Sequence, residues 1–250
     1  MTDGIRRQLD FINQRKHRAF RRELTSEERA QILEEIHNKD LSYMQRAVRR
    51  LELFLQHETP VLLEDTRIQG LRTIIDFPDI YADGEMEEIK KTHFVHEKGK
   101  VTNLACDYGA VLAEGLEGRR KRLETGKKED LQFVECVNRT IDFTEEFADR
   151  YAAEMEKAGQ NESAAVLRRI IRYGADTMEE ALQLFRIIHF TLWASWCYHN
   201  TVGRFDQWIY PFYKKDIKNG VLTEETALEL IEDFFLSFNR DSDLYYSLAW

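Results

Sequence analysis

Proline and glycine are scarce in this chain, and that scarcity limits its possible folds more than any other feature. The 250 residues include 3 Pro and 12 Gly. Sandwiches and barrels of short strands need frequent turns, which proline and glycine supply in most proteins. The sequence therefore predicts a mainly α fold with a few strands.

Several helix starts can be identified from local spacing. A Ser or Thr followed three residues later by Glu or Gln forms a capping box, in which each side chain bonds the other residue's backbone. This spacing occurs at Thr25–Glu28, Ser42–Gln45 and Thr177–Glu180. Apolar periodicity and terminal glycines predict further helices over 108–124, 129–157, 163–173, 178–197, 204–218 and 224–238. Three glycines inside the first of these predict close packing on another backbone: Gly109, Gly115 and Gly118.

Two short runs are the best strand candidates. Val61–Ile68 and Leu71–Phe77 are rich in β-formers and are bounded by turn residues. Such strands are stable only when something packs on them, so we expect helices to cover them.

Acidic residues outnumber basic ones, 45 to 36, which gives a formal net charge of −9. Such a chain does not concentrate on nucleic acid or on anionic membranes. The most apolar stretch, Leu184–Cys197, contains Arg186 and His189 and is shorter than the roughly 20 residues that span a bilayer. The N-terminus lacks a signal-peptide core, and three cysteines without CxxC spacing suit a reducing compartment. We expect a cytoplasmic protein.

Two groupings of His and Cys are weak signals of reactive sites. His93 and His96 share a helical spacing, with Cys106 ten residues on, but HxxH alone is common and no metal site is predicted. Cys197 and His199 are two apart, a spacing at which helix side chains do not face each other.

Charged residues also interrupt an aromatic-rich region. Arg204 and Asp206 flank Phe205, and Trp208 follows. An unpaired charge among aromatic side chains would be costly, so we expect both charges to bond backbone or distant partners.

Five blocks carry a family resemblance. EALQLF at Glu180–Phe185, GRFDQWIYPFYKKDI at Gly203–Ile217 and GVLTEETALELIEDFF at Gly220–Phe235 are the strongest. Upstream lie ETPVLLEDTRIQG at Glu58–Gly70 and DYGAVLAEGLEGRR at Asp107–Arg120. In order and spacing the blocks resemble the pyruvate formate-lyase family of glycyl radical enzymes, and GRFDQ is the most specific. The resemblance covers about residues 58–246.

The resemblance implies a ten-stranded β/α barrel surrounded by helices, of which this chain would be the N-terminal portion, an incomplete barrel. In the family, a separate S-adenosylmethionine iron–sulfur activase installs a radical on a glycine, and the radical oxidises a cysteine to a thiyl. The thiyl then abstracts hydrogen from a small organic substrate. Members need no metal or organic cofactor in their own chain and are typically homodimers.

The family's cysteine loop and RVxGY-type glycine motif both lie beyond the position of Trp250. None of the 3 cysteines or 12 glycines in this sequence has the matching context. The resemblance therefore implies no catalytic residue in this chain, which we expect to be inactive alone.

The resemblance also implies three pocket positions. Asn103 stands where pyruvate formate-lyase has arginine, and a neutral amide cannot grip a carboxylate bidentately, so we expect a substrate other than pyruvate. Tyr198 and His199 stand where that enzyme has small pocket residues, and they could hydrogen-bond a different substrate. A structural motif carries over as Gly203, Arg204, Asp206 and Gln207.

We divide the chain into a helical lead-in, 1–57, and a family-matching region, 58–250, with no linker. The leading interpretation is the N-terminal part of a radical lyase, decarboxylase or dehydratase, whose partners are an activating enzyme and a second copy or a C-terminal half. The alternatives are a non-catalytic binding or regulatory module and one half of a split enzyme. An incomplete barrel is expected to leave strands unpaired and apolar surface exposed.

Overall fold

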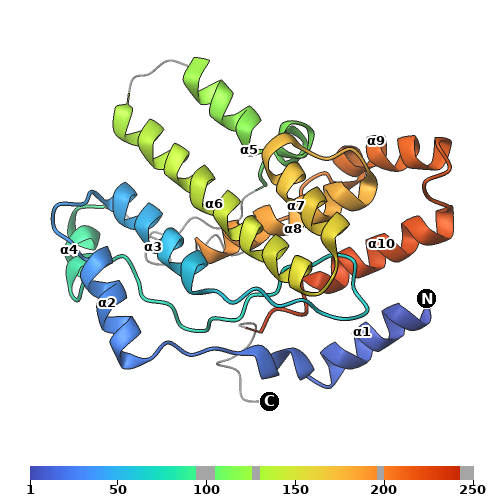
Figure 1. Ribbon diagram of the computed structural model, residues 1–250. Helices are drawn as coiled ribbons and strands as arrows, with labels where there is room; N and C mark the ends of the chain where they lie inside the picture. Colours follow the sequence, from blue (N-terminus) through green and yellow to red (C-terminus); the bar gives the residue numbers. More distant parts are fainter. Residues whose placement is uncertain (94–104, 126–129, 196–199, 243–250) are drawn as a thin grey trace.

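The computed structural model describes residues 1–93, 105–125, 130–195 and 200–242. Within these ranges the chain folds into ten α-helices and one 3₁₀ helix (Figure 1), which confirms the mainly α prediction. In chain order they are α1 (Asp3–Asn13), η1 (Lys16–Phe20), α2 (Ser26–Ile36), α3 (Tyr43–His57), α4 (Glu85–Thr92), α5 (Tyr108–Thr125), α6 (Leu131–Lys157), α7 (Asn161–Tyr173), α8 (Met178–Ala194), α9 (Phe205–Lys218) and α10 (Glu224–Ser237).

The predicted capping boxes start the helices that they were expected to start. The side chains of Thr25, Ser42 and Thr177 accept backbone hydrogen bonds at the starts of α2, α3 and α8, and the reciprocal side-chain bonds are also present. Thr223 forms a further box with Thr226 at the start of α10. The first helical turns are therefore encoded by sequence neighbours.

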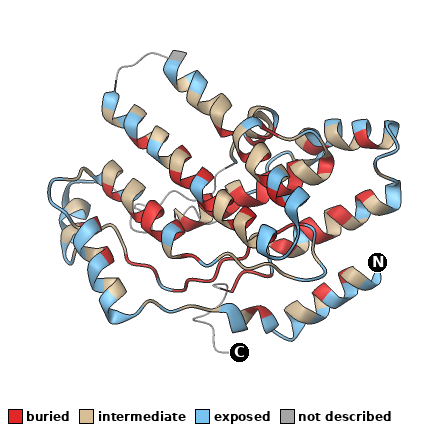
Figure 2. Ribbon diagram, in the orientation of Figure 1, coloured by how far each residue is buried: buried red, intermediate tan, exposed pale blue. Residues whose placement is uncertain are grey.

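Helix α8 forms the centre of the molecule. Twelve of its 17 residues are buried, so other elements surround it on nearly every side (Figure 2). It packs on α3, α5, α7, α9 and α10. Phe185 of α8 contacts aromatic residues of three of these helices. Its ring centroid lies 4.1 Å from that of Tyr108 in α5 and 5.0 Å from those of Trp208 in α9 and Phe234 in α10.

The two predicted strands form one extended segment rather than part of a sheet, which corrects the expectation of a few strands. Among the described residues the only bridge is an isolated parallel one between Arg22 and Ile74. The segment runs below α3 and α8 (Figure 1), and Ile68 and Leu71–Ile75 are buried. Its β-formers lie in the core as predicted, but helices rather than strands adjoin it.

Helix α5 kinks where it crosses the end of α7. Gly115, at the kink, has φ 65° and ψ −172°, a conformation that is essentially restricted to glycine. A Cβ there would lie 2.3 Å from the carbonyl carbon of Arg172, and a Cβ on Gly174 would lie 2.6 Å from the oxygen of Ala113. The predicted close approach of two backbones is thus confirmed at Gly115, whereas Gly109 makes only ordinary contacts.

Candidate functional site

The three predicted pocket residues, Asn103, Tyr198 and His199, lie outside the described residues, as do His96 and Cys197. The structure does describe the residues on either side of Tyr198 and His199. Helix α8 ends at Ala194 before them, and Asn200 follows them. The candidate site is therefore built from α8 and the elements that pack on its C-terminal half.

The GRFDQ motif lies at the start of α9. Gly203 takes a positive φ of 59°, and Arg204 and Asp206 bond each other at 3.1 Å in solvent. The hydrogen bond from Arg204 lowers the pKa of the Asp206 carboxyl. Asp206 also accepts a backbone hydrogen bond from Gln207, as expected, whereas the two side chains pair with each other rather than with distant partners. Gln207 is also exposed, and its N–H donates to the Arg204 carbonyl.

The other His and Cys candidates that the structure describes lie apart from one another. His93 follows α4 on the surface, Cys106 is half-buried, and Cys136 is buried in α6. Burial raises the pKa of the Cys136 thiol, which disfavours the reactive thiolate. No cluster of three or more His, Cys, Asp or Glu side chains in the described ranges could hold a metal ion.

Polar side chains on one face of α8 bind the extended segment. The Gln183 amide bonds both backbone groups of Gln69, and Arg186 Nη2 donates to the Gly70 carbonyl at 2.6 Å. Both α8 residues are buried. Sequence reasoning missed this face, although Arg186 and His189 in an otherwise apolar helix were the available signal.

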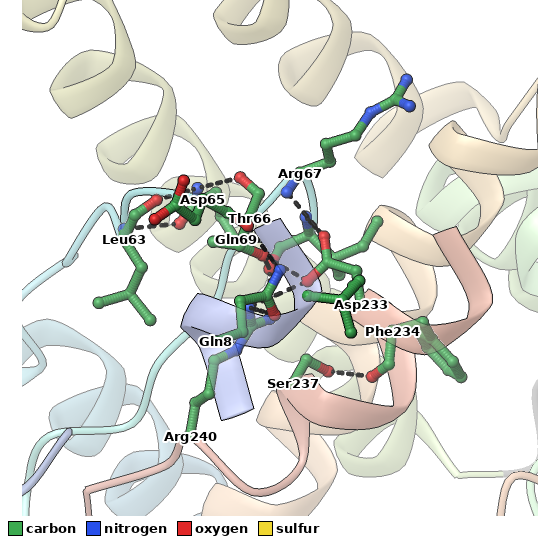
Figure 3. A network of polar contacts seen from close by, with 12 residues as sticks. Gln8, Leu63, Asp65, Thr66, Arg67, Gln69, Asp233, Phe234, Ser237 and Arg240 are labelled. Carbon is green, nitrogen blue, oxygen red and sulfur yellow. Dashed lines mark hydrogen bonds and ion pairs between the residues drawn. The ribbon is translucent and has the colours of Figure 1, made fainter. Parts of the chain in front are cut away.

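A second polar network joins α10 to the same segment (Figure 3). Asp233 accepts from the Thr66 hydroxyl at 2.6 Å and from the backbone N–H of Arg67 and Ile68 at 2.7 and 3.1 Å. Arg240 donates to Asp233 at 3.0 Å and to the Ile68 carbonyl at 2.9 Å. A buried ion pair thus anchors the segment at its start.

Asp241 connects the two networks. Its carboxylate accepts from the Arg72 backbone N–H at 2.9 Å and pairs with the guanidinium groups of Arg72 and Arg186. Burial would raise the pKa of Asp241, but the two cations outweigh burial and hold it below its usual value. The residue is therefore an anion shared by two buried arginines.

His189 lies one helical turn beyond Arg186, among aromatic rings. Its ring centroid lies 4.7 Å from that of Phe238 and 5.8 Å from that of Phe185. Burial, reinforced by the charges of Arg186 and Arg72, lowers the pKa of His189 to about 3. The imidazole is therefore neutral at physiological pH and does not act there as a proton carrier.

A hollow of about 520 Å³ lies between α1 and the loop at 62–65. Its lining includes Arg7, Asp65 and Arg240. Arg7 pairs with Asp65, and Arg240 pairs with Asp233, so these two cations are engaged within the protein. Neither arginine is therefore free to bind an anionic ligand in the hollow.

Comparison with characterised proteins places the chain among radical enzymes. It is 30% identical to (2S)-3-sulfopropanediol dehydratase of Klebsiella oxytoca over 182 residues, which cover 63% of this chain and 22% of that protein. Over 47 residues, 19% of this chain and 6% of the relative, it is 51% identical to isethionate sulfite-lyase of Oleidesulfovibrio alaskensis. The chain thus spans about a fifth of the length of the first of these relatives.

Solved structures share the fold. A Roseburia inulinivorans structure described for 1,2-propanediol dehydration aligns with a TM-score of 0.75 at 20% identity, covering 96% of this chain and 40% of that one. The B12-independent glycerol dehydratase of Clostridium butyricum aligns with a TM-score of 0.71 at 20% identity, covering 92% and 39%. The helical fold described above is therefore a recurring part of larger enzymes.

None of the described helices combines the length and apolar character needed to cross a membrane. The family profile described as pyruvate formate lyase-like matches residues 79–245, more than half of the sequence. The chain therefore belongs to the pyruvate formate lyase-like family of glycyl radical enzymes, and it corresponds to a part of those enzymes.

Proposed function

We propose that this chain is the N-terminal portion of a cytoplasmic glycyl radical dehydratase or lyase that acts on a small organic substrate other than pyruvate. The observation that carries the proposal is the unequal coverage of the fold match, 96% of this chain against 40% of the solved one. The names of the relatives, dehydratases and a sulfite-lyase, support the reaction class. The portion that holds the family's cysteine and glycine would come from further polypeptide.

In this proposal the chain needs no cofactor of its own. A separate S-adenosylmethionine iron–sulfur activase installs the radical on the catalytic portion, and the assembled enzyme is a homodimer. The α8 networks contribute a rigid wall, because each buried charge in them already has an ion-pair or backbone partner that holds it in place.

Radical formation tests the proposal. The chain should show no glycyl doublet in its electron paramagnetic resonance spectrum after anoxic incubation with a family activase, S-adenosylmethionine and a reductant. A complete family enzyme treated with its own activase serves as the positive control. A glycyl doublet from this chain alone would overturn the proposed inactivity.

Substrate choice tests the pocket positions Asn103, Tyr198 and His199. In a complete enzyme that carries this segment, Asn103→Arg should raise KM for the native substrate at least tenfold, because a cation replaces a neutral amide. Asn219→Arg, at the exposed C-terminal end of α9, is the matched control and should leave KM unchanged. An unchanged KM and unchanged substrate preference for Asn103→Arg would contradict the pocket assignment.

A further inference from the structure

Residues 1–21, which contain α1 and η1, are attached to the molecule differently from the other helices. Only Ile5, Gln8 and His17 are buried among them, whereas α8 buries 12 of its 17 residues. The apolar core joins side chains of helices between α2 and α10 and includes none from this segment. In Figures 1 and 2 the segment lies along the lower edge of the molecule. Hydrophobic burial therefore contributes little to keeping it in place.

Polar contacts hold α1 instead. Arg7 pairs with Asp65 at 2.6 Å, and the Gln8 amide donates to the Asp65 carbonyl at 2.5 Å. The side-chain oxygen of Gln8 accepts from Arg240 at 3.0 Å, so Gln8 lies against the buried pair of Arg240 and Asp233 (Figure 3). Contacts of this kind can be exchanged for contacts with water at small net cost.

The helix η1 is attached in the same way. The Ser242 hydroxyl donates to the His17 carbonyl at 2.6 Å, and Arg21 Nε donates to the Ser242 carbonyl at 2.6 Å. The next residue, Arg22, is held more firmly, because its backbone forms the isolated bridge with Ile74 in the buried extended segment. Arg22 is therefore a fixed point at the end of residues 1–21.

The contact between α1 and the loop at 62–65 is also incompletely filled. The hollow of about 520 Å³ lies between them, and the rings of Phe11 and Phe20 line it. Phe20 is 37% exposed, and the two ring centroids lie 6.5 Å apart. Protein interiors are close-packed, so an open space of this size marks a weak contact. Regions with few buried apolar contacts are the ones that open without global unfolding.

We propose that residues 1–21 form a strap that opens about Arg22 as one unit while α2–α10 stay folded, and that His17 makes the opening depend on pH. Opening removes Gln8 from Arg240 and uncovers the loop at 62–65. The strap thus controls access to the polar network that anchors the extended segment. This inference concerns the chain itself and is independent of radical chemistry.

His17 supplies the pH dependence because it is buried where a further positive charge is unfavourable. Its Nδ1 atom has no hydrogen-bond partner in the described part of the chain. The Phe11 ring of α1 packs against it, with ring centroids 6.3 Å apart, and Asp241 faces it with a negative charge. Three cations act on it from η1 and its flanks: Arg15, Arg18 and Arg21.

Burial, followed by these cations, lowers the pKa of His17 in the closed strap. The open strap therefore binds a proton more readily than the closed one, and opening becomes easier as the pH falls below about 6.5. The bond from Arg7 lowers the pKa of Asp65, so this carboxyl stays ionised in the same range.

Hydrogen–deuterium exchange of the purified chain, corrected for the intrinsic rate at each pH, tests the strap. At pH 7, protection factors in α1 should be about a hundredfold or more below those in α8, because α1 exchanges through local opening. Between pH 7 and 5.5, protection in α1 should fall about twofold or more, and His17→Gln should remove this fall. Protection in α1 as high as in α8, no change with pH, or an unchanged fall in His17→Gln would overturn the proposal.

Two exposed ion pairs test whether the strap opens as one unit. Arg7→Gln removes the pair with Asp65 and should lower protection in both α1 and η1 by about twofold or more. Arg29→Gln is the matched control, because Arg29 pairs with Asp76, which has a positive φ as Asp65 does but lies outside the strap. It should leave both unchanged. A loss confined to α1 in Arg7→Gln, or an equal loss in Arg29→Gln, would contradict opening as one unit.

Discussion

Tyr151 bonds the backbone of Leu71 with a single hydroxyl, at 3.0 Å to the nitrogen and 3.3 Å to the oxygen. Burial, followed by the nearby charge of Glu58, raises the pKa of Tyr151, so the hydroxyl keeps the proton that this geometry needs. A buried backbone group left unmatched costs about 1–3 kcal/mol. Individual polar side chains thus decide whether this segment can be buried.

Protonation of His189 should make the stability depend on pH. The unfolded chain binds a proton near pH 6.5, whereas the folded chain does so only near pH 3. Since the unfolded state binds more protons between these values, stability is complete above pH 6.5 and falls as the pH decreases. The free energy of unfolding should therefore drop by up to about 1.4 kcal/mol per pH unit below pH 6.

Urea unfolding at steps between pH 7 and 5, where most carboxylates stay ionised, measures this slope. His189→Gln should flatten it, leaving a smaller part due to His17, whose pKa burial also lowers. If the free energy of unfolding of His189→Gln changes with pH as steeply as that of the parent protein, His189 is not the titrating group.

At the scale of elements, the crossing of α5 and α7 depends on two glycines that face each other's backbones. Each helix passes closer to its neighbour than any side chain permits, and the kink in α5 turns its second half away from α7. Gly115 was predictable as a point of close approach from its position within a helical pattern. The backbone that Gly115 meets could not be predicted, because Arg172 lies on another helix far along the chain.

Gly115→Ala should strongly destabilise the protein. Its Cβ would overlap backbone atoms 2.3 Å away, and backbone cannot move aside as a flexible side chain can. We expect a loss of about 3 kcal/mol or more in chemical denaturation, from backbone strain and overpacking together.

Gly159→Ala is the matched control for this substitution. Gly159 also has a positive φ, 78°, but a Cβ there would meet nothing within 4 Å. Gly159→Ala should lower the free energy of unfolding only by the strain of a left-handed residue, about 1 kcal/mol. If Gly115→Ala and Gly159→Ala lose equal free energy of unfolding, the backbones of α5 and α7 are not in close contact at Gly115.

Over the whole molecule, local patterns predicted most of the fold and few of its long-range contacts. Capping boxes, helix periodicity and the kink glycine depend on residues within a few positions of each other, so they could be identified. The strand prediction was wrong about partners, because β-formers indicate a buried extended chain without indicating what lies beside it. The partners of Gln69 and Arg72 lie more than 100 residues away, on Gln183 and Asp241.

The same contacts correct the expectation of an unpaired barrel strand. Between Ile68 and Ile74 the segment bonds α6 and α8 on one side and residues 240–242 on the other. Both edges are therefore engaged by groups of this chain. Exposed apolar side chains such as Leu131, Tyr210 and Leu228 are scattered singly over α6, α9 and α10, which is ordinary for a protein surface.

The side-chain partners of the extended segment have a consequence for how this protein can evolve. A β-ladder joins main-chain atoms, so it survives most substitutions in either strand. Here Tyr151, Gln183, Asp233 and Asp241 hold the bonds, and a single base change in a codon can remove any one of them. Drift should therefore be slower at these polar positions than at many apolar core positions, where one hydrocarbon side chain can replace another.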